Sequence, residues 1–144
     1  MAAAAAVAAS AAGAVAERMR SSRNSEAAQR LAERRRREDE APRLKAQVPS
    51  LVKLDLEMSD RKGLADAATT YVRRVVIASA PALFEVPCAD PSCRDGGHDL
   101  TYSIMRGLRE GRTSFDGEDV CHGSVGSATC GRTLRYVATA SYQT

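Results

Sequence analysis

The feature that most constrains this chain is the placement of its four cysteines. All of them lie in the last 57 of 144 residues, as two close pairs, Cys88-x4-Cys93 and Cys121-x8-Cys130, with 27 residues between the pairs. Zinc in closed structural sites takes four ligands at tetrahedral angles, and it is commonly held by thiolates that loops supply in pairs. The spacing therefore predicts a structural Zn2+ site formed by Cys88, Cys93, Cys121 and Cys130.

The wide spacing within each pair leaves other chemistries open. Four cysteines can form two disulfides in three ways if the chain enters an oxidising compartment. Free thiols or an iron–sulfur cluster are further alternatives, although the chain shows no partner domain for electron transfer. Gly131, directly after Cys130, favours the metal, because glycine tolerates positive φ and lets backbone N–H groups approach sulfur.

The two histidines, His98 and His122, lie beside the cysteine pairs. Either could replace a thiolate, but we expect both to be non-ligands, with His98 in the turn that leads into a helix. A metal with only three protein ligands could activate water, with Asp95, Asp99 or Glu118 as base. Such a site would make the protein a zinc hydrolase or deaminase. The sequence, however, lacks the glutamate that deaminases place two residues after a histidine ligand. We therefore expect no catalytic residue and no enzyme activity.

The low aromatic content gives a physical reason for a metal clip. The chain has no Trp, two Phe and four Tyr, so its core must consist mainly of aliphatic side chains. Domains of about 90 residues bury little surface on folding and often need a bound metal or a disulfide for additional stability.

Hydrophobic patterns after residue 48 predict the elements of an α+β domain. Residues 52–58 and 133–142 alternate apolar and polar side chains with the period of a half-buried strand. A further β-rich run spans residues 71–79, residues 82–86 continue as extended chain towards Cys88, and residues 115–118 resemble a turn. The expected sheet is antiparallel and has about four strands.

One helix is predicted between the cysteine pairs, over residues 99–110. Leu100, Ile104 and Leu108 share one face of it, Asp99 suits its N-cap, and Gly111 suits its end. The predicted fold is therefore a small antiparallel sheet with one packed helix and a zinc-ribbon-like four-cysteine site.

The first 48 residues differ from the rest in composition and charge. Residues 1–16 are almost entirely alanine, and residues 17–40 favour helix without an apolar stripe. Residues 17–46 carry ten Arg or Lys and six Asp or Glu, whereas residues 47–144 carry eleven and twelve. We therefore expect a low-complexity tail and an Arg-rich arm, helical or disordered, over residues 1–48, and a folded domain over residues 49–144.

These features predict a non-catalytic zinc-binding module that engages a macromolecular partner. The arm would bind RNA or DNA by neutralising phosphates. The candidate residues are Arg30, Arg34, Arg35, Arg36 and Arg37. The flanking acidic residues also fit a merely solvated helix, so the alternative is a protein-interaction or accessory subunit. The chain lacks a membrane-spanning segment and the charged and Leu-rich regions of a signal peptide, so we expect a cytoplasmic protein without a membrane partner.

Overall fold

The computed structural model describes residues 2–63 and 67–144, with the side chains of the first helix described at residues 14, 15, 17, 18, 20, 22 and from 24 onward. The chain forms two compact units, one ending at Glu40 and the other comprising Ala41–Thr144. The first unit is a single helix, α1, over Ala2–Glu40. Its largest described apolar side chain, Leu31, is half exposed, so the helix has no core-facing stripe.

The folded unit begins eight residues before the expected boundary of the domain, because residues 41–48 belong to it. A short helix, α2, spans Leu44–Gln47, and both Leu44 and Val48 are buried in the core. Backbone hydrogen bonds hold this segment, from Leu44 N–H to the Ala80 carbonyl at 2.9 Å and from Ala82 N–H to the Pro42 carbonyl at 2.8 Å.

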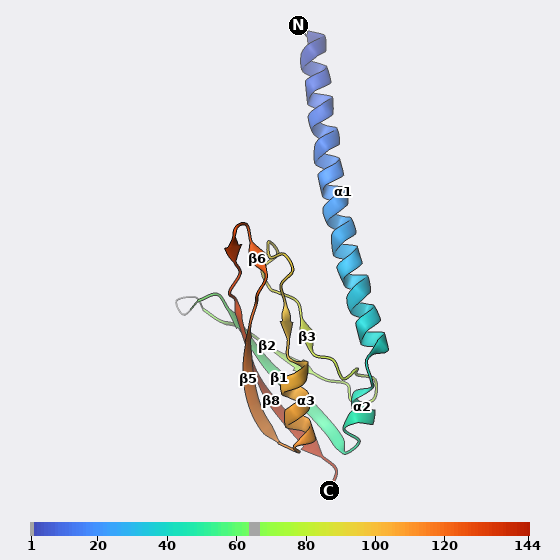
Figure 1. Ribbon diagram of the computed structural model, residues 1–144, viewed down its shortest axis with the longest axis vertical. Coiled ribbons are helices and arrows are strands. Elements are labelled where there is room, and N and C mark those ends of the chain that lie inside the picture. Colours follow the sequence, from blue (N-terminus) through green and yellow to red (C-terminus); the bar gives the residue numbers. More distant parts are fainter. Residues whose placement is uncertain (1, 64–66) are drawn as a thin grey trace. The chain divides into compact units, whose positions relative to one another are not determined.

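The main structure of this unit is a four-stranded antiparallel sheet with the order β2-β1-β8-β5 (Figure 1). The strands are β1 Leu51–Arg61, β2 Thr69–Arg74, β5 Ser114–Val120 and β8 Thr133–Tyr142. Two short ribbons accompany the sheet, one of β3 Glu85–Val86 with β4 His98–Asp99, the other of β6 Ser124–Val125 with β7 Ala128–Thr129. The predicted α+β fold is confirmed.

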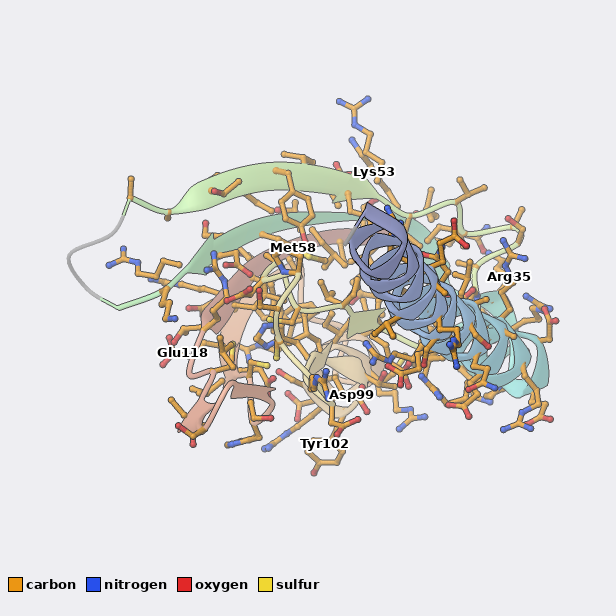
Figure 2. The ribbon with its side chains drawn as sticks, turned by 90° about the horizontal axis from the view of Figure 1, so that it is seen from above. Arg35, Lys53, Met58, Asp99, Tyr102 and Glu118 are labelled. Atoms are coloured by element: carbon orange, nitrogen blue, oxygen red, sulfur yellow. The ribbon has the colours of Figure 1, made fainter. Side chains whose placement is uncertain are left out.

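One face of the sheet builds the core against helix α3, Thr101–Arg109. The alternation expected in β8 is present, since Leu134, Tyr136, Ala138 and Ala140 are all buried. Figure 2 shows Lys53 and Tyr102 on opposite sides of the folded unit, with the sheet and the helix between them. The other face of the sheet carries mostly polar side chains and meets solvent, as is common for antiparallel sheets.

Helix α3 has the predicted apolar stripe, with Leu100, Ile104 and Leu108 each at most 2% exposed. The N-cap position is Leu100 and not the expected Asp99, and no side chain caps it. The Asp99 carboxylate, two residues before the helix start, accepts a hydrogen bond from Thr101 N–H at 3.0 Å. At the other end Gly111 has φ +70°, and Arg112 N–H bonds to the Gly107 carbonyl at 3.0 Å. This is the glycine stop that the sequence predicts.

Three details of the strand predictions are wrong. Residues 115–118 form the centre of β5, because Phe115 is buried in the core and every residue of the segment pairs with β8. The run 71–79 stops being a strand at Arg74, and Val76 is 67% exposed. In β1 the pairing register shifts between Leu51 and Lys53, so that Leu51 is buried and Val52 is exposed.

Candidate metal centre

The structure brings the four cysteines together at the end of the sheet that carries the short ribbons. Their Sγ atoms all lie within 4.8 Å of one another. The Sγ atom of Cys88 lies 3.6 Å from that of Cys130, and the Sγ atom of Cys93 lies 3.7 Å from that of Cys121. Four sulfurs placed about 2.3 Å from one ion at tetrahedral angles are about 3.8 Å apart. The arrangement therefore matches a shared metal ion, and each close contact joins one cysteine from each loop.

The first loop is shaped by an aspartate turn. Cys88 follows β3 through Pro87, and Asp90 then accepts two hydrogen bonds, from Ser92 N–H to its carboxylate at 2.8 Å and from Cys93 N–H to its carbonyl at 3.1 Å. Such turns are typical of aspartate followed by proline. The turn reverses the chain within five residues, and both thiols consequently face the same point.

The second loop is anchored by the backbone at both cysteines. Cys121 N–H donates to the Arg132 carbonyl at 2.8 Å, and Cys130 N–H donates to the Gly123 carbonyl at 2.8 Å. Gly131 has the expected positive φ, +68°, but its N–H bonds to the Cys121 carbonyl and not to sulfur. The β6–β7 ribbon lies between these anchors, at the end of the sheet away from α2 (Figure 1).

Two glycines bring the loops into contact at the thiols, and the sequence did not single them out. A Cβ on Gly96 would lie 2.4 Å from the Cys93 Sγ and 2.5 Å from the Cys121 Sγ. A Cβ on Gly123 would lie 2.5 Å from the Cys93 Sγ and 2.6 Å from the Gly96 Cα. These distances leave no room for a side chain, so the site depends on both glycines. The sequence could have indicated their role, because Gly96 lies three residues after Cys93 and Gly123 lies two residues after Cys121.

The electrostatics of the thiols differ within the cluster. Burial raises the pKa of the Cys93 thiol far above its ordinary value, and the adjacent Cys121 thiol adds to this effect. Burial also opposes ionisation of Cys121, but hydrogen bonds from the N–H groups of Gly97 and Gly123, together with those of the neighbouring thiols, lower the pKa of that thiol. The Gly97 nitrogen lies 3.3 Å from the Cys121 sulfur. Ionisation is therefore easier at Cys121 than at Cys93.

A buried ion pair lies next to the site. Arg132 bonds to the Asp60 carboxylate at 2.7 Å and 2.8 Å through two of its nitrogens, and the Asp60 side chain is 7% exposed. The hydrogen bond that Arg132 donates to Asp60 raises the pKa of Arg132, and the charge of a Cys88 thiolate acts in the same direction. Arg132 is therefore a permanent cation beside a group of thiols. The sequence could have indicated Asp60, because it continues the alternating series of inward-facing residues Leu56 and Met58 with an acidic side chain.

Neither histidine belongs to the thiol cluster in the described residues. His98 is buried, and its Nδ1 lies 2.9 Å from an Asp119 carboxylate oxygen, which fixes the ring to the edge of the sheet. Its Nε2 is buried and has no hydrogen-bond partner within the described part of the chain. His122 is exposed. That neither histidine is a metal ligand stays a prediction.

The arginine cluster lies on α1. Arg30 pairs with Glu26 at 3.6 Å, and Arg34 pairs with Glu38 at 3.4 Å. Arg35 and Arg36 are exposed. Because successive residues turn by about 100° around a helix, the run distributes its charge around α1 and does not form a single face. Binding of nucleic acid by Arg30, Arg34, Arg35, Arg36 and Arg37 stays a prediction.

Comparisons of the chain with protein-family models, with curated proteins and with solved structures gave no significant match. None of the helices in the described residues is long and apolar enough to cross a membrane. The geometry of the site is consequently the basis for any statement about function.

Proposed function

We propose that the chain is a non-catalytic zinc-binding module that holds one structural Zn2+ through Cys88, Cys93, Cys121 and Cys130. The observation that carries the proposal is the set of four sulfurs within 4.8 Å of one another, with the two sulfur–sulfur distances of 3.6 Å and 3.7 Å close to those of a tetrahedral thiolate site. When bound, the ion supplies the positive charge that keeps the buried thiols ionised.

Two features support a structural and not a catalytic metal. Four thiols complete the tetrahedron, whereas catalytic zinc keeps one position for water or substrate. In the described residues, no carboxylate or imidazole joins the four thiols. The third reading, a zinc hydrolase or deaminase, would need one thiol to leave the ion. Cys88 is the only partly exposed member of the set, so it is the thiol that such a reading would have to release.

We further propose that the module engages a macromolecular partner, with nucleic acid as the first candidate. Support comes from the exposed guanidinium groups on α1, which suit non-specific contacts with phosphates. The ion pairs of Arg30 and Arg34 with glutamates compete with this use. The alternative, a protein-interaction or accessory subunit, uses the same helix as a surface for another protein.

Cobalt substitution tests the metal site. Co2+ bound by four thiolates gives strong sulfur-to-metal charge-transfer absorption, which a disulfide-bonded protein cannot produce. We expect this spectrum after Co2+ is added to the reduced, metal-free full chain, and we expect Zn2+ to displace it. Cys130→Ser should weaken the band and change its energy. Ser127→Ala, at the exposed tip of the β6–β7 ribbon, is the matched control and should leave the spectrum unchanged.

Salt-dependent binding tests the role of the arm. Fluorescence anisotropy with a labelled single-stranded RNA should show binding that weakens as salt increases. Replacing residues 34–37 by glutamine keeps helix propensity but removes four charges, and it should reduce the slope of log K against log[salt] by roughly 3. Replacing Arg73 and Arg74 by glutamine is the control in the folded unit. No RNA or DNA binding by the intact chain would favour the protein-interaction alternative.

A further inference from the structure

Strand β5 leaves one edge of the sheet open. Ala140 N–H donates to the Thr113 carbonyl, and Cys121 N–H donates to the Arg132 carbonyl, so the odd-numbered residues of this segment bond to β8. The backbone N–H and C=O groups of Ser114, Asp116 and Glu118 consequently point away from β8. No hydrogen bond to these groups is present in the described part of the chain. An unpaired edge of this kind is a template for another strand.

A cavity lies beside this open edge, under the inner face of the sheet. Its volume is about 470 Å³, and its lining residues come from α3, the turn after it, β5 and β8. They comprise the aromatic rings of Tyr102, Phe115 and Tyr136 and the charged side chains of Arg106, Glu110, Arg112 and Asp116 together with Ser103 and Gly107. The inward-facing positions of β5 next to the edge are Phe115 and Gly117. Gly117 lets the Tyr136 ring approach the strand closely, since a Cβ there would lie 2.8 Å from that ring. An added strand would place its own inward side chains beside this ring, in the cavity.

The hydroxyl groups of Ser103 and Tyr136 bond to each other behind Gly117 and form a polar floor. Tyr102 is 79% exposed on α3 at the opposite rim. Figure 2 shows its ring pointing away from the folded unit. The edge therefore has a binding groove next to it, and not only a row of free backbone groups.

The outward-facing side chains along the edge are acidic. Asp116 bonds to Arg135 at 3.1 Å, and Glu118 lies opposite Arg135 in the register of β5 with β8. One cation thus faces two carboxylates at this edge. A strand added to this edge would find its best partners with Lys or Arg at its outward positions.

The same charges disfavour a second copy of this chain as the occupant. Antiparallel pairing of two β5 strands about Gly117 would place Asp116 of one copy directly opposite Glu118 of the other. Like charges at opposite positions destabilise a strand pair. A basic segment from another protein fits where a second β5 does not.

We propose that the β5 edge binds an extended basic segment of a partner protein, which adds to the sheet as a fifth strand. Its outward residues are Lys or Arg, and its inward residues are apolar side chains that enter the cavity beside α3. Recognition of this type takes affinity from main-chain hydrogen bonds and specificity from alternate side chains. The inference goes beyond the proposed function, because it uses neither the thiols nor the arginines of α1.

Nuclear magnetic resonance on the 15N-labelled, zinc-loaded full chain tests this site with a defined probe. The probe is a blocked seven-residue peptide in which Lys and Val alternate. Amides of residues 114, 116 and 118 should shift and become protected from exchange, whereas the amides of 115 and 117, already bonded to β8, should gain little protection. A peptide with Glu in place of Lys, and one N-methylated at alternate residues, should each bind at least tenfold more weakly.

Charge reversal on the edge provides the matched variants. Asp116→Lys with Glu118→Lys should weaken binding of the Lys/Val peptide about tenfold or more. Asp55→Lys with Glu57→Lys changes the net charge equally on a central strand and should weaken binding less than threefold. Equal losses in both variants would overturn the site in favour of non-specific attraction. Shifts confined to the β2 edge, or shifts that depend on protein concentration without peptide, would also overturn it.

Discussion

The two ends of the folded unit are held together by different means. Around α3 the sheet buries a continuous aliphatic core, with Leu54, Leu56, Ile104 and Leu134 fully buried. At the other end the buried cluster consists of cysteines. Among the described residues, Val125 is the one apolar side chain other than cysteine that packs against it, and the strands beside it are two residues long. Apolar burial therefore stabilises the sheet and helix, whereas the cysteine end has little apolar surface to hold it together.

Removal of the metal should have the largest effect. Cys130→Ser, or a strong chelator under reducing conditions, should destabilise the cysteine end by several kcal/mol, because metal binding and folding are coupled in small sites. Hydrogen exchange should rise in residues 88–97 and 121–131, while amides of β1 and β8 stay protected. Simultaneous loss of protection in the whole unit would mean that both ends form one cooperative structure.

A cavity in the aliphatic core should give the opposite pattern. Ile104 is fully buried on α3, and Ile104→Ala should lower the free energy of unfolding of the sheet and helix by about 4 kcal/mol. Chemical denaturation followed by circular dichroism measures this change. Stoichiometric metal binding under native conditions should persist. Weaker metal binding by the folded Ile104→Ala variant under native conditions would contradict the separation of the two ends.

The ion pair between Asp60 and Arg132 joins the two ends, since Asp60 lies on β1 and Arg132 follows the last cysteine by two residues. Arg132→Met should cost about 3 kcal/mol, because it leaves the buried Asp60 carboxylate without its partner. Urea denaturation provides the measurement. Adding Asp60→Leu to this variant should recover most of the loss. A double variant as unstable as the single one would show that Arg132 acts through the thiols instead.

Gly96→Ala should weaken metal binding with little effect on the distant core. The new Cβ would overlap the sulfurs of Cys93 and Cys121, so we expect a roughly 100-fold loss of affinity, about 2.7 kcal/mol. Competition with a chromophoric chelator reports the affinity. Gly126→Asn, at a turn with φ +63° and open space, is the control that should keep the affinity.

Surface ion pairs should matter least at either end. Arg106 and Glu110 pair at 3.2 Å on the exposed side of α3. Glu110→Gln should change the free energy of unfolding by about 0.3 to 0.5 kcal/mol, and less at high salt. A loss above about 1 kcal/mol in urea denaturation would indicate that this pair supports the helix against the sheet in a way that its exposure does not suggest.

The sequence was informative where one pattern determined the structure. The alternation in residues 133–142 and the stripe of Leu100, Ile104 and Leu108 predicted β8 and α3, because one face of each had to be buried. The cysteine spacing predicted which residues meet. Their clustering is observed, whereas the identity of the metal, the partner and the cellular compartment remain predictions.

The sequence was misleading where tertiary contacts decided. Residues 115–118 contain Asp and Gly, typical of a turn, yet pairing with β8 and burial of Phe115 make them a strand. Because the register shifts after Leu51, the Val52 side chain is exposed and not on the buried face where the alternation predicted it. No local sequence pattern marks such a bulge. Leu44 was assigned to the arm because its contacts are with residues distant in sequence.

Native mass spectrometry combined with thiol counting shows whether the four cysteines hold one zinc ion. The full chain, purified without added metal, should carry one zinc per molecule, and four thiols should react only after unfolding or chelation. A metal-free chain lighter by the mass of two or four hydrogen atoms, with the missing thiols recovered only by reduction, would show disulfides and contradict the account.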